Sequence, residues 1–376
     1  MSDSESASDS ESPAAVGGGL GLDSICDHLR SSSLSLSLLP DQMNSPARAS
    51  PRASPRTPVS PQSPRAHEAS RSLRASVFER LHPTCFGSVT LSACSKIGAR
   101  ERNEDRVLVV PSVYGDPRVH MFCVLDGLLG DGAAIAASEK LLTFIAETAE
   151  FREALERSEY EGFANQTVQK ILGAAFVRGF ADADADVLAR VASPLVAASG
   201  CVAVLAGGAL AVAHVGDALC ALGVESSGSG GVTLQGRFLS AAHRPDSASE
   251  RLRAEEAGGA VVFVRGAAHL RGSDFHEKQL QGIAPSQLPT SRGFGGRDLK
   301  GAGFSCEPDV TSIRVDASVR FAVIASSGLW EAVTVDDAMR VINEGVRDGA
   351  DPANKLVDYA LTKSTQNVSA VVVVFQ

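Results

Sequence analysis

The sequence predicts an α+β fold in which antiparallel sheets are covered by helices. Apolar runs typical of strands come in neighbouring groups, and pairs of helical patterns separate these groups. Residues 201–205 and 209–215 form two such runs, joined by Ala206-Gly-Gly208, which is a hairpin signal. This order favours antiparallel sheets over a regular alternation of strand and helix. The chain has 376 residues, 44% of them apolar, so it can bury a substantial core.

The apolar patterns in the first half of the globular part predict two strands followed by two helices. Residues 107–110 and 119–125 are short apolar runs of strand length. After them, apolar residues recur at helical spacing within 135–145 and again within 168–180.

In the second half, local signals mark where elements begin and end. Ser247-Ala-Ser-Glu250 is a capping box that predicts a helix start, and Gly258 stands where that helix would stop. Asp351-Pro352 predicts another helix with proline in its first turn. Residues 368–375 form the last predicted strand.

The chain divides near residue 80 into a biased tail, 1–80, and a globular domain, 82–376. Six Ser-Pro or Thr-Pro pairs lie between residues 45 and 64, with arginines interleaved or following. Such a segment has too little apolar surface to offset its chain entropy, so we expect disorder. Phosphorylation by proline-directed kinases and a plain solvated linker are both open interpretations. Residues 33–39 alternate Ser and Leu like an isolated strand.

Composition excludes several classes of function. The net charge of −9 argues against nucleic-acid binding, and no apolar run approaches the ~20 residues of a membrane helix. The acidic, serine-rich N-terminus does not resemble a secretion signal. The seven cysteines form no C-x-x-C pair, which argues against a zinc site or a disulfide framework. We therefore expect an intracellular protein, cytoplasmic or nuclear, with no membrane or nucleic-acid partner.

Polar residues stand at the ends of the predicted strands, where an active site or an ordinary turn would place them. The positions are Glu104-Asp105, Asp126-Gly127, Asp217, Ser327-Gly328 and Gln366-Asn367. If the strands alternate in direction, these points could meet at one rim of the sheets. Clustered carboxylates repel one another, and a hard divalent cation bound through oxygen relieves that repulsion. Taken singly, each pair is also a common turn sequence.

The order of these motifs resembles the protein phosphatase 2C family of metal-dependent phosphatases. The resemblance runs from about residue 86 to residue 375. The matching stretches begin at Gly98, Val124, Ser199, Ala213, Leu239, Ser291, Glu307, Ala325 and Asn367. The family fold that this implies is an α-β-β-α sandwich of two antiparallel sheets with helices on both outer faces.

The resemblance also implies a chemistry. In the family, two Mg²⁺ or Mn²⁺ ions activate a water that attacks phosphorus, while the metals and an arginine take up phosphoryl charge. Arg100 matches that arginine. Glu104, Asp105, Asp126 and the carbonyl of Gly127 match the ligand set of one metal position. Asp217 matches an acid implicated in a weaker third metal.

The other half of the family's site has changed in this sequence. Ser327 and Gln366 stand where the family has aspartates that hold the second core metal. Gly296 replaces an aspartate, and Leu128 replaces a histidine thought to act as a general acid. A hydroxyl or amide is a poor substitute for a carboxylate as a ligand to a hard dication. Glu331 stands where the family commonly has Asp.

These departures predict a pseudophosphatase: a phosphatase-like domain that acts as a binding or regulatory module and retains at most one Mg or Mn ion. We expect its partner to be a protein or phosphoprotein, with a proline-directed kinase acting on the tail. The alternative is an active or weakly active serine/threonine phosphatase in which Asp298 or Asp274 substitutes as a ligand. A third hypothesis makes the domain structural and assigns function to the phosphorylated tail.

Four further predictions concern single residues. Asp182, Asp184 and Asp186 are expected to lie on a solvated helix edge. We expect His214 to be packed in the core and His243 to be structural. Trp330, the only tryptophan, is expected to anchor the turn after Gly328.

Overall fold

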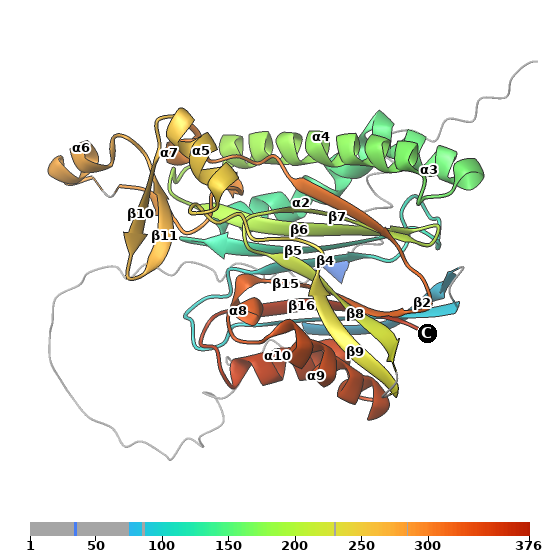
Figure 1. Cartoon of the computed structure of the whole chain (residues 1–376). Helices are drawn as coiled ribbons and strands as arrows, with labels where there is room; N and C mark the ends of the chain where they lie inside the picture. The colour runs from blue at the N-terminus through green and yellow to red at the C-terminus, as the bar shows by residue number, and fades with distance from the viewer. Residues whose placement is uncertain (1–33, 36–74, 85–86, 229–230, 284) are drawn as a thin grey trace, which may run out of the picture.

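The computed structural model describes residues 34–35, 75–84, 87–228, 231–283 and 285–376. Two β-sheets lie face to face, and helices cover both outer faces (Figure 1). This is the predicted α-β-β-α sandwich.

The first sheet runs β1-β4-β5-β6-β7-β14, with the short β13 paired to β6. All of its neighbouring strands are antiparallel. Its strands are β1 (Leu34–Ser35), β4 (Arg106–Val110), β5 (His120–Leu128), β6 (Ala197–Ala206), β7 (Ala209–Val215), β13 (Phe294–Gly295) and β14 (Asp309–Arg314).

The second sheet runs β2-β3-β16-β15-β8-β9 and is also antiparallel throughout. Its strands are β2 (Ala75–Thr84), β3 (Gly87–Lys96), β16 (Val368–Phe375), β15 (Val319–Ala325), β8 (Leu219–Gly228) and β9 (Gly231–Phe238).

The central strand β16 shows why these runs are apolar without alternation. All eight of its residues are buried. Val371 and Val373 face the core between the two sheets, while Val372 and Val374 face the core under the outer helices. Because successive side chains point to opposite faces, a strand covered on both sides must be apolar at every position.

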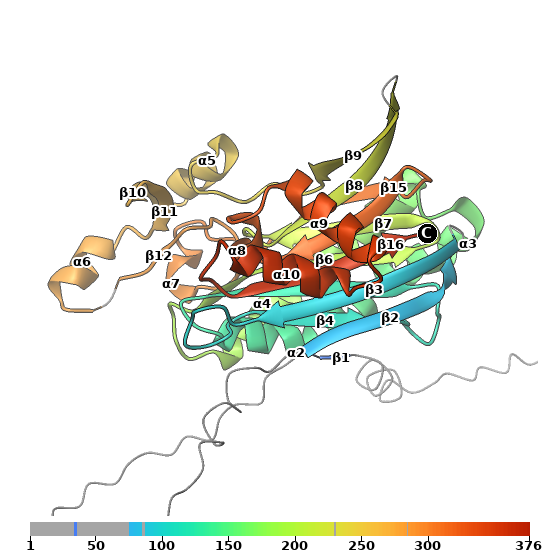
Figure 2. The same cartoon turned by 90° about the horizontal axis from the view of Figure 1, so that it is seen from below.

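Two helical layers enclose the sandwich. The first sheet is covered by α2 (Gly132–Glu147), α3 (Ala149–Glu161) and α4 (Gln166–Arg190). The second is covered by α9 (Val335–Arg347) and α10 (Pro352–Leu361), as Figure 2 shows from below. The Asp351 side chain caps α10 by accepting a hydrogen bond from the backbone N–H of Asn354 at 2.9 Å. Pro352 lies in the first turn, as predicted.

A side lobe formed by residues 248–304 projects from one end of the sandwich (Figure 1). Its own core includes Leu270, Leu288 and Phe304. It contains α5 (Ala248–Glu256), β10 (Ala260–Val264), β11 (Ala267–Arg271), α6 (Phe275–Leu280), β12 (Gln287–Leu288) and α7 (Arg297–Lys300). The sequence signals predicted only α5 of this set.

The structure corrects the predicted capping box. Ser247 is the N-cap of α5, but its side chain makes no capping hydrogen bond. Glu250, the other member of the box, is 3% exposed and is bound by Arg292 instead. An ion pair with the partly buried Arg292 replaces the local contact.

The predicted boundary near residue 80 also differs from the structure. Strand β2 begins at Ala75 and pairs along β3, so the folded part starts before residue 82. Within 33–39, Leu34 and Ser35 pair with Val109 and Leu108. The predicted Ser-Pro tail otherwise lies outside the described residues. Within the described ranges, no helix has the length and apolar character needed to cross a membrane.

Candidate functional site

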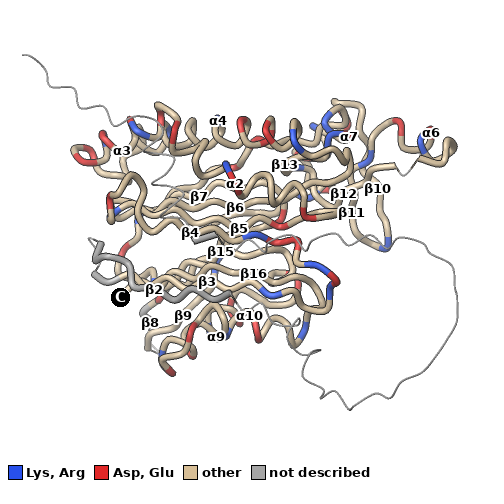
Figure 3. The backbone as a smooth tube through the Cα atoms, turned by 180° about the vertical axis from the view of Figure 1, so that it is seen from behind, with Lys and Arg blue, Asp and Glu red and all other residues tan. Residues whose placement is uncertain are grey.

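The predicted strand-end residues meet at the end of the sheets beside the side lobe. Asp126 lies two residues before the end of β5, Asp217 follows β7, and Ser327 begins the short helix α8 (Ser327–Trp330) after β15. Glu104 precedes β4 and Gln366 precedes β16. The antiparallel pairing places these ends at one rim. Figure 3 shows acidic and basic positions together at this end.

Asp126 and Ser327 are joined directly. The Ser327 backbone N–H and hydroxyl both donate to Asp126 Oδ2, at 2.8 and 2.6 Å. Asp126 is 8% exposed. Burial, followed by the nearby carboxylates of Asp105 and Asp217, raises the pKa of Asp126 well above its ordinary value, although the Ser327 donors oppose the shift. The oxygen that faces position 327 is therefore occupied by hydrogen-bond donors.

The backbones of Glu104 and Gly127 lie in close contact. A Cβ added at Gly127 would lie 2.7 Å from the Glu104 carbonyl oxygen, so only glycine fits there. Asn367 Oδ1 accepts a hydrogen bond from the Glu104 backbone N–H at 2.9 Å and fixes this turn. The motif around Asn367 thus positions the acidic motif on the far side of the site.

Asp105 is the most buried acid of the group. Its side chain is 3% exposed, and its Oδ2 has no hydrogen-bond partner among the described residues. Burial raises the pKa of Asp105 to about 6, against the opposing effect of the hydroxyls of Ser369 and Ser326. A buried carboxylate oxygen without a donor is a position where a cation would be stabilising.

Arg100 is held by one of the substituted positions. Its Nη2 donates to Gln366 Oε1. In the family resemblance, residue 100 contacts phosphate and residue 366 contacts metal. Here the amide and the guanidinium satisfy each other instead.

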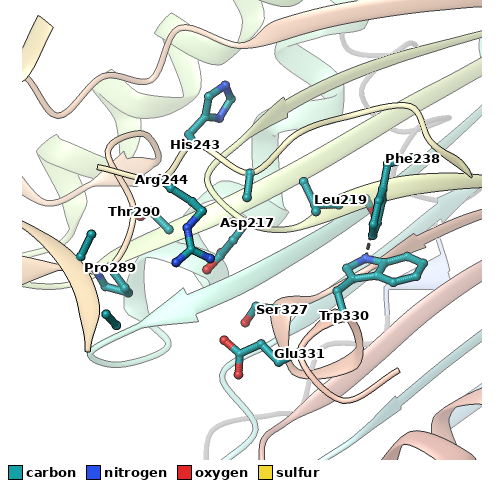
Figure 4. Close-up of a pocket in the computed structure, with 13 residues that line it drawn as sticks. Asp217, Leu219, Phe238, His243, Arg244, Pro289, Thr290, Ser327, Trp330 and Glu331 are labelled. Atoms are coloured by element: carbon teal, nitrogen blue, oxygen red, sulfur yellow. Dashed lines mark hydrogen bonds between the residues drawn. The ribbon is translucent and has the colours of Figure 1, made fainter. Parts of the chain in front are cut away.

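Asp217 lies on the other side of Asp126, at the wall of a cavity of about 330 Å³ (Figure 4). Ser199 donates its hydroxyl to Asp217 Oδ1 at 2.6 Å. The cavity is also lined by Arg244, Ser327, Trp330 and Glu331. The predicted anchoring role of Trp330 agrees with its contacts, because its Nε1 donates to the Leu219 carbonyl at 3.2 Å.

Two of the four substituted positions lie outside the carboxylate cluster. Leu128 packs against the core of the side lobe. Gly296 caps α7 in a left-handed conformation with φ of 58°, and a Cβ there would lie 3.0 Å from the Phe304 ring. Both positions therefore contribute to the packing of the side lobe.

The two acids considered as substitute ligands belong to the side lobe. Lys278 contacts Asp298 Oδ2 at 2.7 Å and Asp274 Oδ2 at 2.9 Å. Ser286 also donates to Asp298, at 3.1 Å. Both carboxylates are therefore already engaged by the same lysine.

Asp184 does not lie on a solvated edge, so that prediction was wrong. It is 6% exposed, accepts the Gly295 N–H at 2.8 Å and pairs with Lys300 at 2.8 Å. It ties α4 to the segment that ends in Gly296. A spacing of two residues on a helix gave no sign of this long-range contact.

His214, His243 and Asp309 form a second cluster that sequence reasoning missed. Both histidines are buried, and their rings stack with centroids 4.5 Å apart. The three side chains are close enough to share a cation. However, His243 Nδ1 accepts the Gly216 N–H at 3.0 Å, so the proton of the neutral ring is on Nε2, which faces Asp309 at 3.2 Å. This tautomer leaves His243 no free lone pair for a metal.

In the described part of the chain, no three of the strand-end carboxylates place oxygens within 4.8 Å of one another, as a shared cation would require. The carboxylates of Asp105 and Asp217 lie near enough to Asp126 to raise its pKa, and Asp105 Oδ2 has no hydrogen-bond partner among the described residues. On the other side Ser327 donates to Asp126, and Gln366 is bound to Arg100. The side chains of Ser327 and Gln366 are therefore already engaged by other residues of the rim.

Comparison with known proteins gives the same family as the motifs. The family model for Protein phosphatase 2C matches residues 89–369. "Probable protein phosphatase 2C 32" of Oryza sativa subsp. japonica is 30% identical over 284 residues, which are 74% of this chain and 63% of that protein. "Probable protein phosphatase 2C 2" of Arabidopsis thaliana is 29% identical over 73% of this chain and 64% of that protein. The chain thus spans less than two thirds of either relative.

Solved structures support the fold. A serine-threonine phosphatase 2C from Toxoplasma gondii aligns with a TM-score of 0.72 and 28% identity, covering 81% of this chain and all of that chain. A second Toxoplasma gondii phosphatase, 18% identical with a TM-score of 0.58, shares the fold. Members of this family depend on Mg or Mn. The motifs, the sandwich and these matches together show that the chain belongs to the protein phosphatase 2C family.

Proposed function

We propose that this protein is a pseudophosphatase: a phosphatase 2C domain that binds a protein partner and hydrolyses phosphoesters weakly or not at all. The observation that carries the proposal is the pair of hydrogen bonds from Ser327 to Asp126 Oδ2. In a two-metal site the corresponding oxygens would all bind metal ions, and none of them would donate a hydrogen bond to its neighbour. Here one of the two residues is a donor, so the pair is complete without a metal.

The number of charged ligands favours loss of one metal over weak binding of both. Two-metal hydrolysis needs both ions, because together they activate the water and take up charge on phosphorus. Ser327 and Gln366 remove two negative charges from the ligand set. The groups that remain are the carboxylates of Glu104, Asp105 and Asp126, which can bind a cation, and the guanidinium of Arg100, which can donate hydrogen bonds.

An active phosphatase with a rearranged site is the second candidate, and the names of the curated relatives favour it. It requires Asp298 or Asp274 to leave Lys278 and move to the rim. Each would lose an ion pair of less than 3 Å to do so. This cost counts against the rearrangement.

The test is Mn²⁺-dependent hydrolysis of a phosphothreonine peptide by the full chain. Three proteins are compared: wild type, Asp126→Asn, and the repair Ser327→Asp with Gln366→Asp. Gly296 is left unchanged because its positive φ and the Phe304 contact would strain any side chain. The proposal predicts that the repaired protein exceeds wild type by at least about 100-fold, which corresponds to about 3 kcal/mol of transition-state stabilisation. Wild-type turnover that equals the repaired protein and disappears in Asp126→Asn would refute it.

A further inference from the structure

The cavity beside Asp217 lies between the second sheet and the side lobe, and much of its lining is apolar (Figure 4). Leu219, Phe238 and Trp330 line it from the sandwich, and Ala267, Ala268 and Pro289 line it from the side lobe. The rings of Phe238 and Trp330 meet edge to face with centroids 5.1 Å apart, and the indole hydrogen bond to the Leu219 carbonyl holds Trp330 in place. This wall can pack against a further aromatic ring.

Thr290 adds a buried polar group to the lining. The residue is 1% exposed, and its Oγ1 has no hydrogen-bond partner among the described residues. Figure 4 shows Thr290 across the cavity from Phe238 and Trp330. The hydroxyl of Ser327, which also lines the cavity, already donates to Asp126. Because a buried hydroxyl without a partner is costly, the site favours an occupant that brings a hydrogen-bonding group of its own.

A third aromatic ring lies just outside the lining. Phe263 of β10 is paired directly with Ala268 of β11, which lines the cavity. Directly opposed residues of an antiparallel pair carry their side chains on the same face, so Phe263 extends the side-lobe wall of the cavity. Phe263 is 63% exposed. A ligand confined to the cavity would leave this ring in water, whereas a polypeptide segment that continues out of the cavity can cover it.

We propose that this cavity binds a tyrosine side chain presented by an extended segment of a partner protein. The inference deepens the proposed function and rests on it, because that function makes the domain a protein-binding module. The tyrosine ring packs on Phe238 and Trp330, while its hydroxyl supplies the hydrogen-bond partner that Thr290 needs. Phenylalanine would fill the same space but would leave the Thr290 hydroxyl unpaired.

The N-terminal tail of the chain cannot supply this side chain. The sequence has three tyrosines, Tyr114, Tyr160 and Tyr359, and all of them follow the tail. Tyr114 donates its hydroxyl to the Ala146 carbonyl, and the Tyr359 ring packs against Lys363, whose Nζ lies 4.4 Å from the ring centroid. Both side chains are therefore engaged within the domain.

Charge disfavours a second copy of the chain as the occupant. Tyr160 is 90% exposed, but its two neighbours in sequence are glutamates, which would bring two carboxylates to the cavity. The lining already has two carboxylates, of Asp217 and Glu331, and one guanidinium, of Arg244. Like charges repel across such a contact, so the tyrosine is expected on a different protein, without acidic neighbours.

The experiment uses Trp330 as its reporter, because it is the only tryptophan of the chain and lines the cavity. Its fluorescence is recorded in the full-length protein, in EDTA, during titration with the peptide Gly-Ser-Tyr-Ser-Gly and with the matched peptide Gly-Ser-Phe-Ser-Gly. Thr290→Val removes the hydroxyl and keeps the shape of the side chain. Thr167→Val makes the same change at an exposed position on α4 and is the control.

We expect wild type to bind the tyrosine peptide at least about fivefold more tightly than the phenylalanine peptide, as one hydrogen bond to an otherwise unpaired group predicts. Thr290→Val should bring the two affinities within about twofold of each other, and its melting temperature should equal or exceed that of wild type, because an unpaired buried hydroxyl is removed. Thr167→Val should keep the preference for tyrosine. Equal binding of the two peptides by wild type, or an unchanged preference in Thr290→Val, would overturn the proposal.

Two further measurements test the other occupants. Phe263→Ala should weaken binding of the tyrosine peptide but leave binding of free p-cresol, the side-chain analogue of tyrosine, unchanged. If p-cresol binds wild type as tightly as the peptide does, the site belongs to a small phenol and not to a protein segment. Sedimentation of wild type and Tyr160→Ser at rising concentration tests a second copy. Self-association that disappears in Tyr160→Ser would contradict a separate partner.

The titrations separate this inference from the proposed function, because they contain EDTA and do not depend on turnover. A protein without phosphatase activity that shows no preference for the tyrosine peptide refutes the inference alone. Mn²⁺-dependent turnover equal to that of the repaired protein, together with a retained preference for tyrosine, refutes the proposed function alone.

Discussion

At residue 327 a hydroxyl occupies a position where the family has a carboxylate, and the difference changes the direction of the hydrogen bonds. A carboxylate at 327 would only accept, and it would repel Asp126 unless a cation lay between them. The serine donates to Asp126 and needs no cation. Under the proposed function, this one substitution would remove a metal ligand, while the serine supplies two hydrogen bonds to the neighbouring acid.

The burial of His243 should make the free energy of unfolding depend on pH. Burial, together with the nearby His214 and Arg292, lowers the pKa of His243 to about 4 from 6.5. Because the unfolded chain takes up this proton first, the free energy of unfolding should fall as the pH drops from 6.5 towards 4. The full shift corresponds to about 3 kcal/mol.

The check is urea unfolding at pH 7.5, 5.5 and 4.5 for wild type, His243→Asn and His276→Asn. Asparagine can still accept the Gly216 N–H but carries no titratable proton, so His243→Asn should lose less stability on acidification. His276, exposed on α6, is the control and should behave as wild type. Parallel losses in all three proteins would show that His243 does not contribute.

Much of the site could be predicted at the level of single residues. The order of the motifs located Glu104, Asp126, Asp217 and Ser327, and the structure brings them to one rim. Their hydrogen-bond partners could not be predicted, because these come from residues far along the chain. Ser327 and Asp126 are 201 positions apart, and Arg100 and Gln366 are 266 apart.

At the scale of elements, Glu250 attaches α5 to the Ser291–Arg292 segment, and Arg292 in turn pairs with Asp309 of β14 at 3.0 Å. The Glu250 carboxylate accepts from Arg292 Nη2 at 2.6 Å, Arg253 Nη2 at 2.5 Å and the Ser291 hydroxyl at 2.5 Å. Burial alone would raise the pKa of Glu250, but these donors outweigh it and lower the pKa to about 2. The stability it contributes is present above pH 4.5 and is lost as the pH falls towards 2.

Glu250→Gln should therefore destabilise the protein by about 3 kcal/mol at pH 7, because it leaves two arginines near a neutral amide in a buried site. Glu255→Gln on the same helix is the control. Its partner Arg251 lies 3.8 Å away, and both side chains are exposed, so the expected loss is below about 1 kcal/mol. Denaturant unfolding gives both values. Similar losses in the two variants would contradict the attachment role.

Elements with strong local signals were predicted well, and elements that depend on distant contacts were not. The valine run of β16 and the proline start of α10 encode their structures locally. The side lobe has short strands with exposed positions, such as Phe263 on β10, which is 63% exposed. The small core of the lobe and the ion pairs of Glu250 stabilise the sheet formed by β10, β11 and β12. Neither set of contacts produces a periodic pattern in the sequence.

At the scale of the whole molecule, the proposed function requires that the phosphatase 2C fold is kept while its metal site is changed. The sandwich needs no metal to bring the strand ends together, since both sheets have continuous cores. Loss of two ligands at the rim leaves these cores unchanged. Under the proposed function, the scaffold would therefore still support binding without catalysis.

The most direct test is the number of Mn²⁺ ions bound per chain, measured by calorimetric titration of the metal-free full-length protein. The account predicts at most one ion for wild type and two for Ser327→Asp with Gln366→Asp. A wild-type chain that binds two Mn²⁺ ions as tightly as the repaired protein would contradict it, because the hydrogen bonds from Ser327 to Asp126 would then not exclude the second metal.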